Sequence, residues 1–298
     1  MRRGMMRAAG ILAASLTLWG CGKTTEAGQT DGETMTTEAG QTDGDTMTAE
    51  AGQTDDEIMT AERAGDTFSV MGDSISTFQG HNPAGYYAFF PESGAVSAVE
   101  DTWWQQVAED LELTLLTNGS SSGATVAGDS TGSDPQCGCN ELRTGALAGP
   151  DGACPDRIIV YLGANDMIQA VPLGDNDGTR PVQEGEVAAF SDAYTLMLDK
   201  LQAKYPAAEI YCCTLHQMGN YGTETPYVEF VNGAGLTAQD YGDVIAGIAK
   251  NRGLYVIDLY RCGIAVENLQ ETTSDGVHPS AAGMAFIAEA VKKGITGE

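Results

Sequence analysis

His278 is the one histidine of this chain with a carboxylate three residues upstream, and the chain contains only three histidines. The motif is Asp275-Gly276-Val277-His278, followed by a proline. A carboxylate at this spacing on a turn can lie against the imidazole edge, where it fixes the ring tautomer and stabilises the imidazolium. The pair predicts a general base that works near neutral pH, and such a base needs a nucleophile elsewhere in the chain.

Ser74, in the motif Gly72-Asp73-Ser74, is the candidate nucleophile. The apolar run at residues 67–71 predicts a strand that leads directly into the motif. Ser74 would then lie at a strand-to-helix turn, where backbone N–H groups face the reacting centre. The same tripeptide recurs at residues 128–130 without a strand before it, and there we expect a solvated loop.

Ser121 is a rival nucleophile, because residues 119–123 (Gly-Ser-Ser-Ser-Gly) fit the G-x-S-x-G elbow of α/β-hydrolases. The order serine, aspartate, histidine along the chain would also hold. That fold places its elbow after several strands, however, and only two strands are expected before Ser121. A serine-rich turn that supplies backbone donors suits the segment better.

Asn165 lies in residues 163–166 (Gly-Ala-Asn-Asp), directly after another apolar run. Its carboxamide could donate a hydrogen bond to an oxyanion. Together with the backbone N–H groups of Ser74 and Gly123, it would provide three donors around a tetrahedral intermediate. Glycine and asparagine also favour turns that end strands, so a purely structural turn is the alternative.

Three other features have weaker functional interpretations. His216 could contact substrate, but it lacks an acidic partner in sequence, and a polar loop histidine is the preferred interpretation. Residues 175–178 (Asp-Asn-Asp-Gly) lack the third acidic position and the terminal glutamate of an EF-hand loop, which favours a turn over a calcium site. The aromatic cluster at residues 86–90 either lines an acyl or sugar subsite or covers the sheet edge.

The elements that must position these residues alternate between strands and helices. Strands are predicted at residues 67–71, 113–117, 157–162, 209–214 and 254–259. Helices are predicted at residues 101–111, 186–204, 237–251 and 279–293, with Asp101 as the first N-cap and Pro279 in the last helix's first turn. This alternation predicts an α/β domain, a three-layer α/β/α sandwich with a five-stranded, mostly parallel sheet. Ligands of such sheets bind at the carboxyl ends of the strands, where all the motifs above are expected.

Four of the segments described above, residues 72–74, 119–123, 163–166 and 275–279, resemble in this order the sequence blocks of the SGNH/GDSL hydrolase family. The resemblance covers most of residues 66–298. The serine block matches Gly72-Asp73-Ser74, although residues 75–77 (Ile-Ser-Thr) replace the leucine that gives the family its name. The third block matches residues 163–166 in full, and the last matches residues 275–279. The glycine block matches best at Gly123, with Gly119 as the alternative.

The resemblance implies the flavodoxin-like fold of this family and a role for each matched residue. Ser74 would be the nucleophile, His278 the general base and Asp275 its orienting partner. Gly123 and Asn165 would complete the oxyanion hole with Ser74. Family members work without a metal, so no cofactor is expected.

The charge of residues 66–298 restricts the classes of molecule that this domain can bind. Residues 66–298 contain 31 acidic and 10 basic side chains, a field that disfavours nucleic acid and anionic membrane surfaces. We expect a serine esterase that removes a small acyl group, most simply acetyl, from a small molecule or glycan ester. A lysophospholipase or broad lipase-esterase of the same fold, and a non-catalytic glycan-binding surface lipoprotein, are the alternatives.

The first twenty residues read as a signal peptide. Three arginines precede an apolar run of twelve residues from Ala8 to Trp19, too short to span a bilayer. The run ends at Leu18-Trp19-Gly20-Cys21, which resembles a bacterial lipobox. We therefore expect an extracytoplasmic, cell-surface protein attached to the membrane through a lipid on Cys21.

Residues 21–65 read as a disordered acidic spacer. A twelve-residue repeat starts at Thr25, Thr37 and Ala49, and residues 24–63 hold eleven acidic side chains and one basic. Such a segment cannot bury enough apolar surface to offset its chain entropy. Residues 66–298 are then the hydrolase domain, of a length that suits one full-sized core.

Six further cysteines follow Cys21, an even number that permits disulfides outside the cytoplasm. Cys137 or Cys139 could close a loop with Cys154. Cys212 and Cys213 are neighbours in a predicted strand, so they should point to opposite faces and serve as small core residues. The sixth is Cys262. No histidine stands at ligand spacing from these cysteines, so no zinc site is expected.

Overall fold

Five parallel strands form the central sheet, in the order β2-β1-β4-β6-β7. A computed structural model describes residues 66–222 and 226–298. The strands are β1 (Thr67–Gly72), β2 (Thr114–Asn118), β4 (Arg157–Tyr161), β6 (Glu209–Cys213) and β7 (Tyr255–Ile257). The predicted signal peptide, Cys21 and acidic spacer lie outside the described residues.

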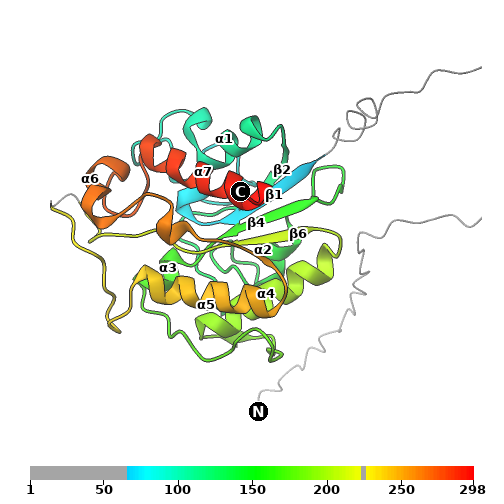
Figure 1. Cartoon of the computed structure of the whole chain (residues 1–298). Coiled ribbons are helices and arrows are strands. Elements are labelled where there is room, and N and C mark those ends of the chain that lie inside the picture. Colours follow the sequence, from blue (N-terminus) through cyan, green and yellow to red (C-terminus); the bar gives the residue numbers. More distant parts are fainter. Residues whose placement is uncertain (1–65, 223–225) are drawn as a thin grey trace, which may run out of the picture.

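Helices cover both faces of this sheet and make three layers (Figure 1). On one side lie α1 (Trp103–Asp110), α6 (Leu269–Thr272) and α7 (Ala281–Thr296). On the other lie α2 (Glu141–Gly145), α3 (Ala164–Ile168), α4 (Phe190–Lys204) and α5 (Ala238–Asn251). In the part of the chain that the structure describes, four short 3-10 helices join them: η1 (Ser74–Ser76), η2 (Val99–Asp101), η3 (Leu259–Arg261) and η4 (Val266–Asn268). The predicted three-layer α/β fold is confirmed.

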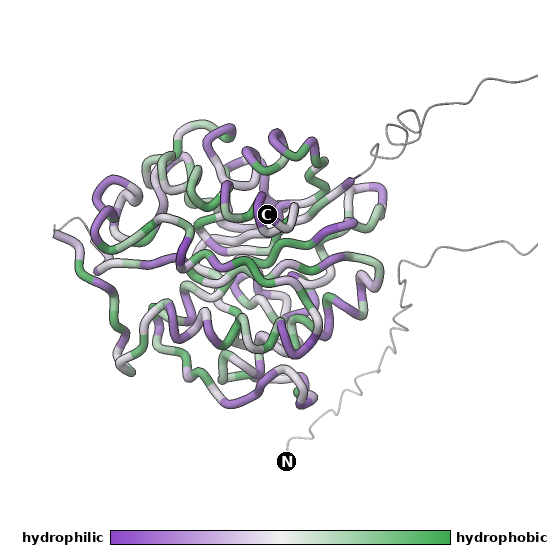
Figure 2. Tube along the Cα trace, in the orientation of Figure 1, coloured by the Kyte–Doolittle hydropathy of each residue, from purple (hydrophilic) through white to green (hydrophobic). Residues whose placement is uncertain are grey.

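The sheet forms because its strands are apolar on both faces. Residues 158–160 (Ile-Ile-Val) in the middle of β4 are fully buried, as a parallel strand covered on both sides requires. The hydropathy colouring of Figure 2 shows this apolar centre, with hydrophilic segments toward the outside of the helices and loops. Trp103, Trp104 and Val107 of α1 are fully buried and anchor that helix. None of the helices described in residues 66–222 and 226–298 is long and apolar enough to span a bilayer.

The predicted starts of three helices are wrong by a few residues, and the last helix, α7, runs to Thr296, beyond the predicted end at residue 293. Thr102, not Asp101, caps α1, since its hydroxyl accepts from the Gln105 N–H at 3.4 Å and Asp101 belongs to η2. Pro279 precedes α7 instead of starting it, because Ser280 is the N-cap and Pro279 bridges to Thr273.

The helix predicted from residue 186 begins at Phe190, because Glu186 and Val187 form a short strand, β5 (Glu186–Val187). This strand pairs antiparallel with β3 (Gly128–Asp129), and the pairing buries Ser130 completely. The Ser130 hydroxyl accepts from the Gly185 N–H at 2.8 Å, and its own N–H donates to the Gly185 carbonyl at 2.8 Å. The second Gly-Asp-Ser copy is therefore part of a short strand pair in which Ser130 is buried and Asp129 exposed, and the prediction of a solvated loop was wrong for Ser130.

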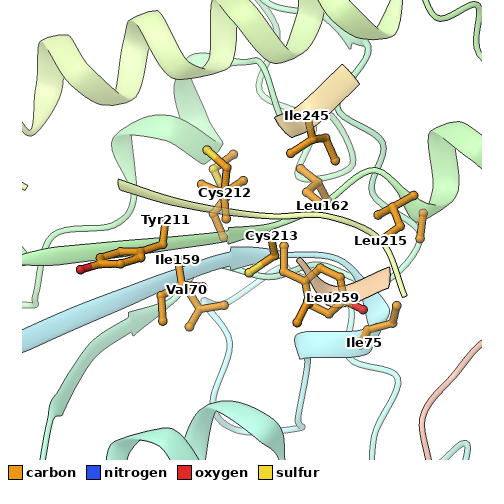
Figure 3. Close-up of a cluster of buried hydrophobic side chains, with 14 of the residues drawn as sticks. Val70, Ile75, Ile159, Leu162, Tyr211, Cys212, Cys213, Leu215, Ile245 and Leu259 are labelled. Atoms are coloured by element: carbon orange, nitrogen blue, oxygen red, sulfur yellow. The ribbon is translucent and has the colours of Figure 1, made fainter. Parts of the chain in front are cut away.

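The cysteines divide into core residues and one close pair. Cys212 and Cys213 are fully buried, and Figure 3 shows their side chains on opposite sides of β6, as predicted. Cys137 and Cys139 are free thiols whose sulfur atoms lie 3.6 Å apart, so neither forms the predicted disulfide with Cys154. The segment that carries them lies beside residues 125–126 instead, to which it is joined by main-chain hydrogen bonds.

Candidate active site

Ser74 stands in the first turn after β1, at the carboxyl edge of the sheet. Asp73 is the N-cap of η1 and accepts from the Ile75 N–H at 3.1 Å, which turns the chain sharply at the serine. The turn requires glycine at position 72, because a Cβ there would lie 2.7 Å from the Ser76 hydroxyl oxygen. Ser74 is left only 7% exposed, with its hydroxyl at the surface of a cavity.

Arg143 supports this turn from beneath. Its guanidinium is fully buried and donates to the Gly72 carbonyl at 2.8 Å and to the Pro135 carbonyl at 2.5 Å. Burial is the largest influence on the Asp73 carboxyl and raises its pKa to about 6, against the lowering effects of the Ile75 N–H, His278 and Arg143. The nucleophile turn therefore rests on buried polar groups.

The loop at residues 273–279 presents His278. Asp275 accepts from the Val277 N–H at 3.0 Å and the His278 N–H at 2.8 Å with one oxygen, and from Nδ1 of His278 at 2.7 Å with the other. Gly276 has φ +86°, and a Cβ there would lie 2.7 Å from the Asn220 carbonyl oxygen, so this turn admits only glycine. Burial opposes ionisation of Asp275, but its hydrogen bonds with His278 and the charge of that ring outweigh this and lower its pKa.

The predicted nucleophile and base meet although 204 residues separate them. Nε2 of His278 lies 2.9 Å from Oγ of Ser74. Because Nδ1 donates to the Asp275 carboxylate, Nε2 is unprotonated in the neutral ring and can accept the serine hydrogen. The three side chains therefore form one continuous hydrogen-bonded chain that ends at the cavity.

This cavity measures about 270 Å³ and is open to solvent on one side. Phe89 stacks on the His278 ring, with centroids 3.7 Å apart and planes inclined by 12°. Tyr221 makes a T-shaped contact with the same ring, with centroids 6.1 Å apart and planes inclined by 71°. Ile168 and Ala164 add apolar wall from α3. Two aromatic rings therefore contact the base.

Two of the three predicted oxyanion donors line the cavity beside the serine. Gly123 and Asn165 both face it, whereas the N–H of Gly119 donates to the Val70 carbonyl at 2.8 Å and is used by the sheet. One N–H of the Asn165 carboxamide donates to the Ala124 carbonyl at 3.0 Å, which fixes the amide plane and leaves the second N–H for a ligand. This arrangement favours Gly123 over Gly119.

Asp166 joins the two segments that carry these donors. Its carboxylate accepts from the N–H groups of Val126 at 2.7 Å and Ala127 at 3.0 Å, and so ties α3 to the chain that follows Gly123. Burial raises the pKa of Asp166 to about 7, although both N–H donors act against that rise. The spacing of Gly123 and Asn165 is therefore held by this buried carboxyl group together with the bond from Asn165 to Ala124.

The other sequence candidates lie apart from the reacting atoms. The Ser121 hydroxyl accepts from the Tyr87 N–H at 3.2 Å and from Gln136 at 3.1 Å, so it holds the aromatic segment in place and faces no histidine. Residues 176–179 form side-chain-capped turns, in which Asn176 accepts from the Gly178 N–H at 3.0 Å. Within residues 66–222 and 226–298, no group of three histidine, cysteine or acidic side chains could hold a metal ion.

His216 and the aromatic cluster have positions that sequence alone left open. His216 lies in the loop after β6, as the preferred interpretation expected, but it is fully buried and bonded to the Val277 carbonyl behind His278, so it does not line the cavity. In the cluster, Phe89 lines the cavity, Phe90 is fully buried and Tyr87 is 62% exposed. One member of the cluster, Phe89, therefore lies where a substrate subsite would be, whereas Phe90 packs in the protein interior.

Several residues of the site were missed by the sequence reasoning. Phe89 was included only as part of the cluster, and Ile168, Tyr221, Asp166 and Arg143 were not assigned to the site at all. The Asp166 carboxylate could have been suspected from its place next to Asn165 in a buried turn. The others carry no local signal, because their roles come from packing across the fold.

The chain belongs to the GDSL-like lipase/acylhydrolase family, whose sequence model matches residues 66–227. This membership confirms the resemblance drawn from the four sequence blocks, and it makes the protein a member of a hydrolase family with esterase chemistry. A search among curated proteins finds no relative that matches this sequence.

Solved structures agree with this assignment at the level of the fold. A protein from Bacteroides uniformis described as a GDSL-like lipase is 24% identical, with a TM-score of 0.58, over 79% of this chain and 98% of its own. One from Bacteroides ovatus with the same description is 23% identical, with a TM-score of 0.57, over 79% of this chain and all of its own. A carbohydrate acetylesterase family member from Sinorhizobium meliloti is 17% identical, with a TM-score of 0.51, over 78% of this chain and 98% of its own.

Proposed function

We propose that the protein is a serine esterase that hydrolyses carboxylic esters, acetyl esters of carbohydrates in particular, through Ser74, His278 and Asp275. The observation that carries the proposal is the hydrogen-bonded chain of these side chains, 2.9 Å from Ser74 to His278 and 2.7 Å from His278 to Asp275. These are the distances that a nucleophile and its general base need for proton transfer.

In the proposed reaction, Oγ of Ser74 attacks the ester carbonyl carbon while Nε2 of His278 takes its proton. The oxyanion receives hydrogen bonds from the N–H groups of Ser74 and Gly123 and from the free amide N–H of Asn165. The imidazolium then protonates the departing alcohol oxygen, and the acyl group stays on Ser74. Water, deprotonated by the same histidine, hydrolyses the acyl-enzyme.

The size and charge of the site support a short acyl group on a neutral molecule. The cavity, at about 270 Å³, is just below the range of about 300–1,000 Å³ that encloses drug-sized ligands. An acetyl group fits beside Phe89 and Ile168, whereas a long acyl chain would extend into solvent. The excess of acidic side chains in residues 66–298 disfavours anionic substrates.

The test is hydrolysis of p-nitrophenyl acetate, octanoate and palmitate, followed by acetylated xylo-oligosaccharides and lysophosphatidylcholine. We expect kcat/KM to be highest for acetyl esters, and the Ser74→Ala variant to lose at least about 10⁴-fold in kcat. Ser130→Ala, in the second Gly-Asp-Ser copy, is the matched control and should keep its activity. Full activity in Ser74→Ala would exclude the nucleophile, and preference for lysophosphatidylcholine would favour the lysophospholipase alternative. No turnover of any ester would favour a glycan-binding protein.

We also propose that the protein is anchored outside the cytoplasm through a lipid on Cys21. The proposal rests on the sequence at residues 8–21, which lies outside the described structure. Metabolic labelling with radioactive palmitate should mark the wild-type protein and not Cys21→Ala. Equal labelling of both proteins would exclude this anchor.

A further inference from the structure

Two buried side chains lie directly behind the loop that carries His278. Tyr161 is the last residue of β4, and His216 follows the end of β6 by three residues. His216 is fully buried and Tyr161 is 1% exposed. The Tyr161 hydroxyl lies 2.6 Å from Nδ1 of His216, and Nε2 of His216 lies 3.0 Å from the Val277 carbonyl oxygen.

The partners of His216 determine its protonation. A carbonyl oxygen can only accept, so Nε2 of His216 carries the hydrogen and donates it to Val277. Nδ1 is then the acceptor, and the Tyr161 hydroxyl donates to it. Burial is the main cause that lowers the pKa of His216 to about 4, and the ionisable groups that act on it are His278 and Asp275. The ring is therefore neutral, in the Nε2–H tautomer.

His216 and Asp275 hold opposite ends of a single peptide group. The carbonyl of Val277 accepts from His216 at 3.0 Å, and the N–H of the same peptide, which belongs to His278, donates to Asp275 at 2.8 Å. Bonds at the two ends of a peptide group polarise it and strengthen each other. This peptide carries the Cα atom of His278, so its orientation sets where the imidazole points.

We propose that His216 is a positioning residue for the ester hydrolysis proposed above, on which this inference rests. As the neutral Nε2–H tautomer selected by Tyr161, it holds the peptide between Val277 and His278 so that the imidazole stays within hydrogen-bonding reach of Ser74. It acts through the main chain and does not touch substrate.

The first test separates positioning from substrate binding. In His216→Phe, which removes the donor to Val277, we expect kcat to fall about tenfold or more, the rate equivalent of one lost buried hydrogen bond, with KM nearly unchanged. His216→Gln should restore most of the rate, because the glutamine amide nitrogen reaches about as far as Nε2. Tyr161→Phe should lose less, and the double variant with His216→Phe should be no worse than His216→Phe, since the two act as one unit. His81→Phe is the control, because His81 is the remaining histidine and contacts Phe78 and Trp104 instead.

The second test reads the nucleophile without a substrate. The rate of Ser74 labelling by a fluorophosphonate should fall in His216→Phe in parallel with kcat. A wild-type protein that labels no faster than Ser74→Ala would reject the proposed esterase itself. A wild-type protein that labels normally, with His216→Phe labelling as fast, would reject only the positioning role.

The third test reads the tautomer in the wild-type protein, and a variant serves only for the assignment. With only three histidines in the chain, ¹⁵N-labelled imidazoles can be followed by NMR in the intact protein. We expect one ring to stay neutral, protonated at Nε2, between about pH 5 and 8. Its assignment to His216 follows from its loss in His216→Gln. An Nδ1–H tautomer or a charged His216 ring in this range would overturn the proposal.

Discussion

Asp275 uses its two carboxylate oxygens differently. One accepts from Nδ1 of His278, and the other accepts from the backbone N–H groups of Val277 and His278. The carboxylate therefore orients the imidazole both directly and through the main chain. Replacing the oxygen that accepts from the backbone N–H groups should disturb the fold of the loop. Replacing the oxygen that accepts from Nδ1 should disturb the catalytic chemistry instead.

We expect Asp275→Asn to fold and to lose about 10⁴-fold in kcat. The amide oxygen would stay on the two backbone N–H groups, which turns the NH₂ group toward Nδ1 of His278. Nδ1 of His278 must then accept a hydrogen bond from the amide, so the hydrogen of the neutral ring moves to Nε2. Nε2 can then no longer take the proton of Ser74. Steady-state kinetics with p-nitrophenyl acetate measures the loss, and Asp177→Asn, in an exposed turn, is the control. Activity within tenfold of wild type would contradict the assigned tautomer.

At the scale of elements, the oxyanion donors Gly123 and Asn165 belong to two segments that follow different strands of the sheet. Gly123 follows β2, and Asn165 lies in the first turn of α3 after β4. Asp166 connects them by accepting from the Val126 and Ala127 N–H groups. The geometry of the donors therefore depends on a side chain that need not touch the substrate.

We expect Asp166→Asn to destabilise the fold by about 1–3 kcal/mol and to lower kcat. The amide must turn one N–H donor toward a backbone N–H group, which leaves a buried donor unpaired and leaves the two segments joined mainly by the bond from Asn165 to Ala124. Urea denaturation measures the stability, and kcat on acetyl esters measures the donor geometry. Asp177→Asn should change stability by no more than about 0.5 kcal/mol. Unchanged kcat in a folded Asp166→Asn protein would show that the two donors do not need this link.

At the scale of the whole molecule, four buried or half-buried groups give stability a dependence on pH. Burial raises the pKa of Asp73 to about 6 and of Asp166 to about 7, from 3.8. The folded state then binds more protons than the unfolded state between about pH 4 and 7, so both groups favour folding as the pH falls. His216 acts oppositely, because its pKa is lowered to about 4 and the unfolded state takes up its proton first. Asp275, whose pKa is lowered, loses its contribution only as the pH falls below about 4.

These signs predict greater stability near pH 5 than near pH 7. At about 1.4 kcal/mol per pKa unit, the full shifts correspond to about 3 and 4 kcal/mol for the two carboxyl groups and about 3 kcal/mol for His216. Between pH 7 and pH 5 only part of each is realised, about 1 and 2 kcal/mol gained at the carboxyl groups against about 2 kcal/mol lost at His216. The formal net charge of −27 adds repulsion at neutral pH, in the same direction. Urea midpoints measured from pH 4 to 8 test this, and Asp166→Asn should flatten the slope between pH 5 and 7. A midpoint that rises steadily toward pH 8 in both proteins would contradict it.

The sequence allowed the order of strands and helices and the four site blocks to be predicted, because both depend on local pattern. Apolar runs identify the strands, and glycine, aspartate and asparagine after them identify the turns at their carboxyl ends. Helix ends were less accurate, since Thr102 and Ser280 compete with their neighbours for the same caps. The short pairing of β3 with β5 has no such local signal.

By itself, the sequence determined the fold class and the residue types of Ser74, Asp275 and His278, since periodicity and motif spacing are properties of neighbouring residues. Only the tertiary structure decided that Oγ of Ser74 lies 2.9 Å from Nε2 of His278, although the two residues are 204 positions apart in the sequence. It also decided that Cys137 and Cys139 stay free and that His216 lies behind the base. The physical reason is that a contact between distant residues depends on how the helices pack on the sheet, and local sequence pattern does not contain that information.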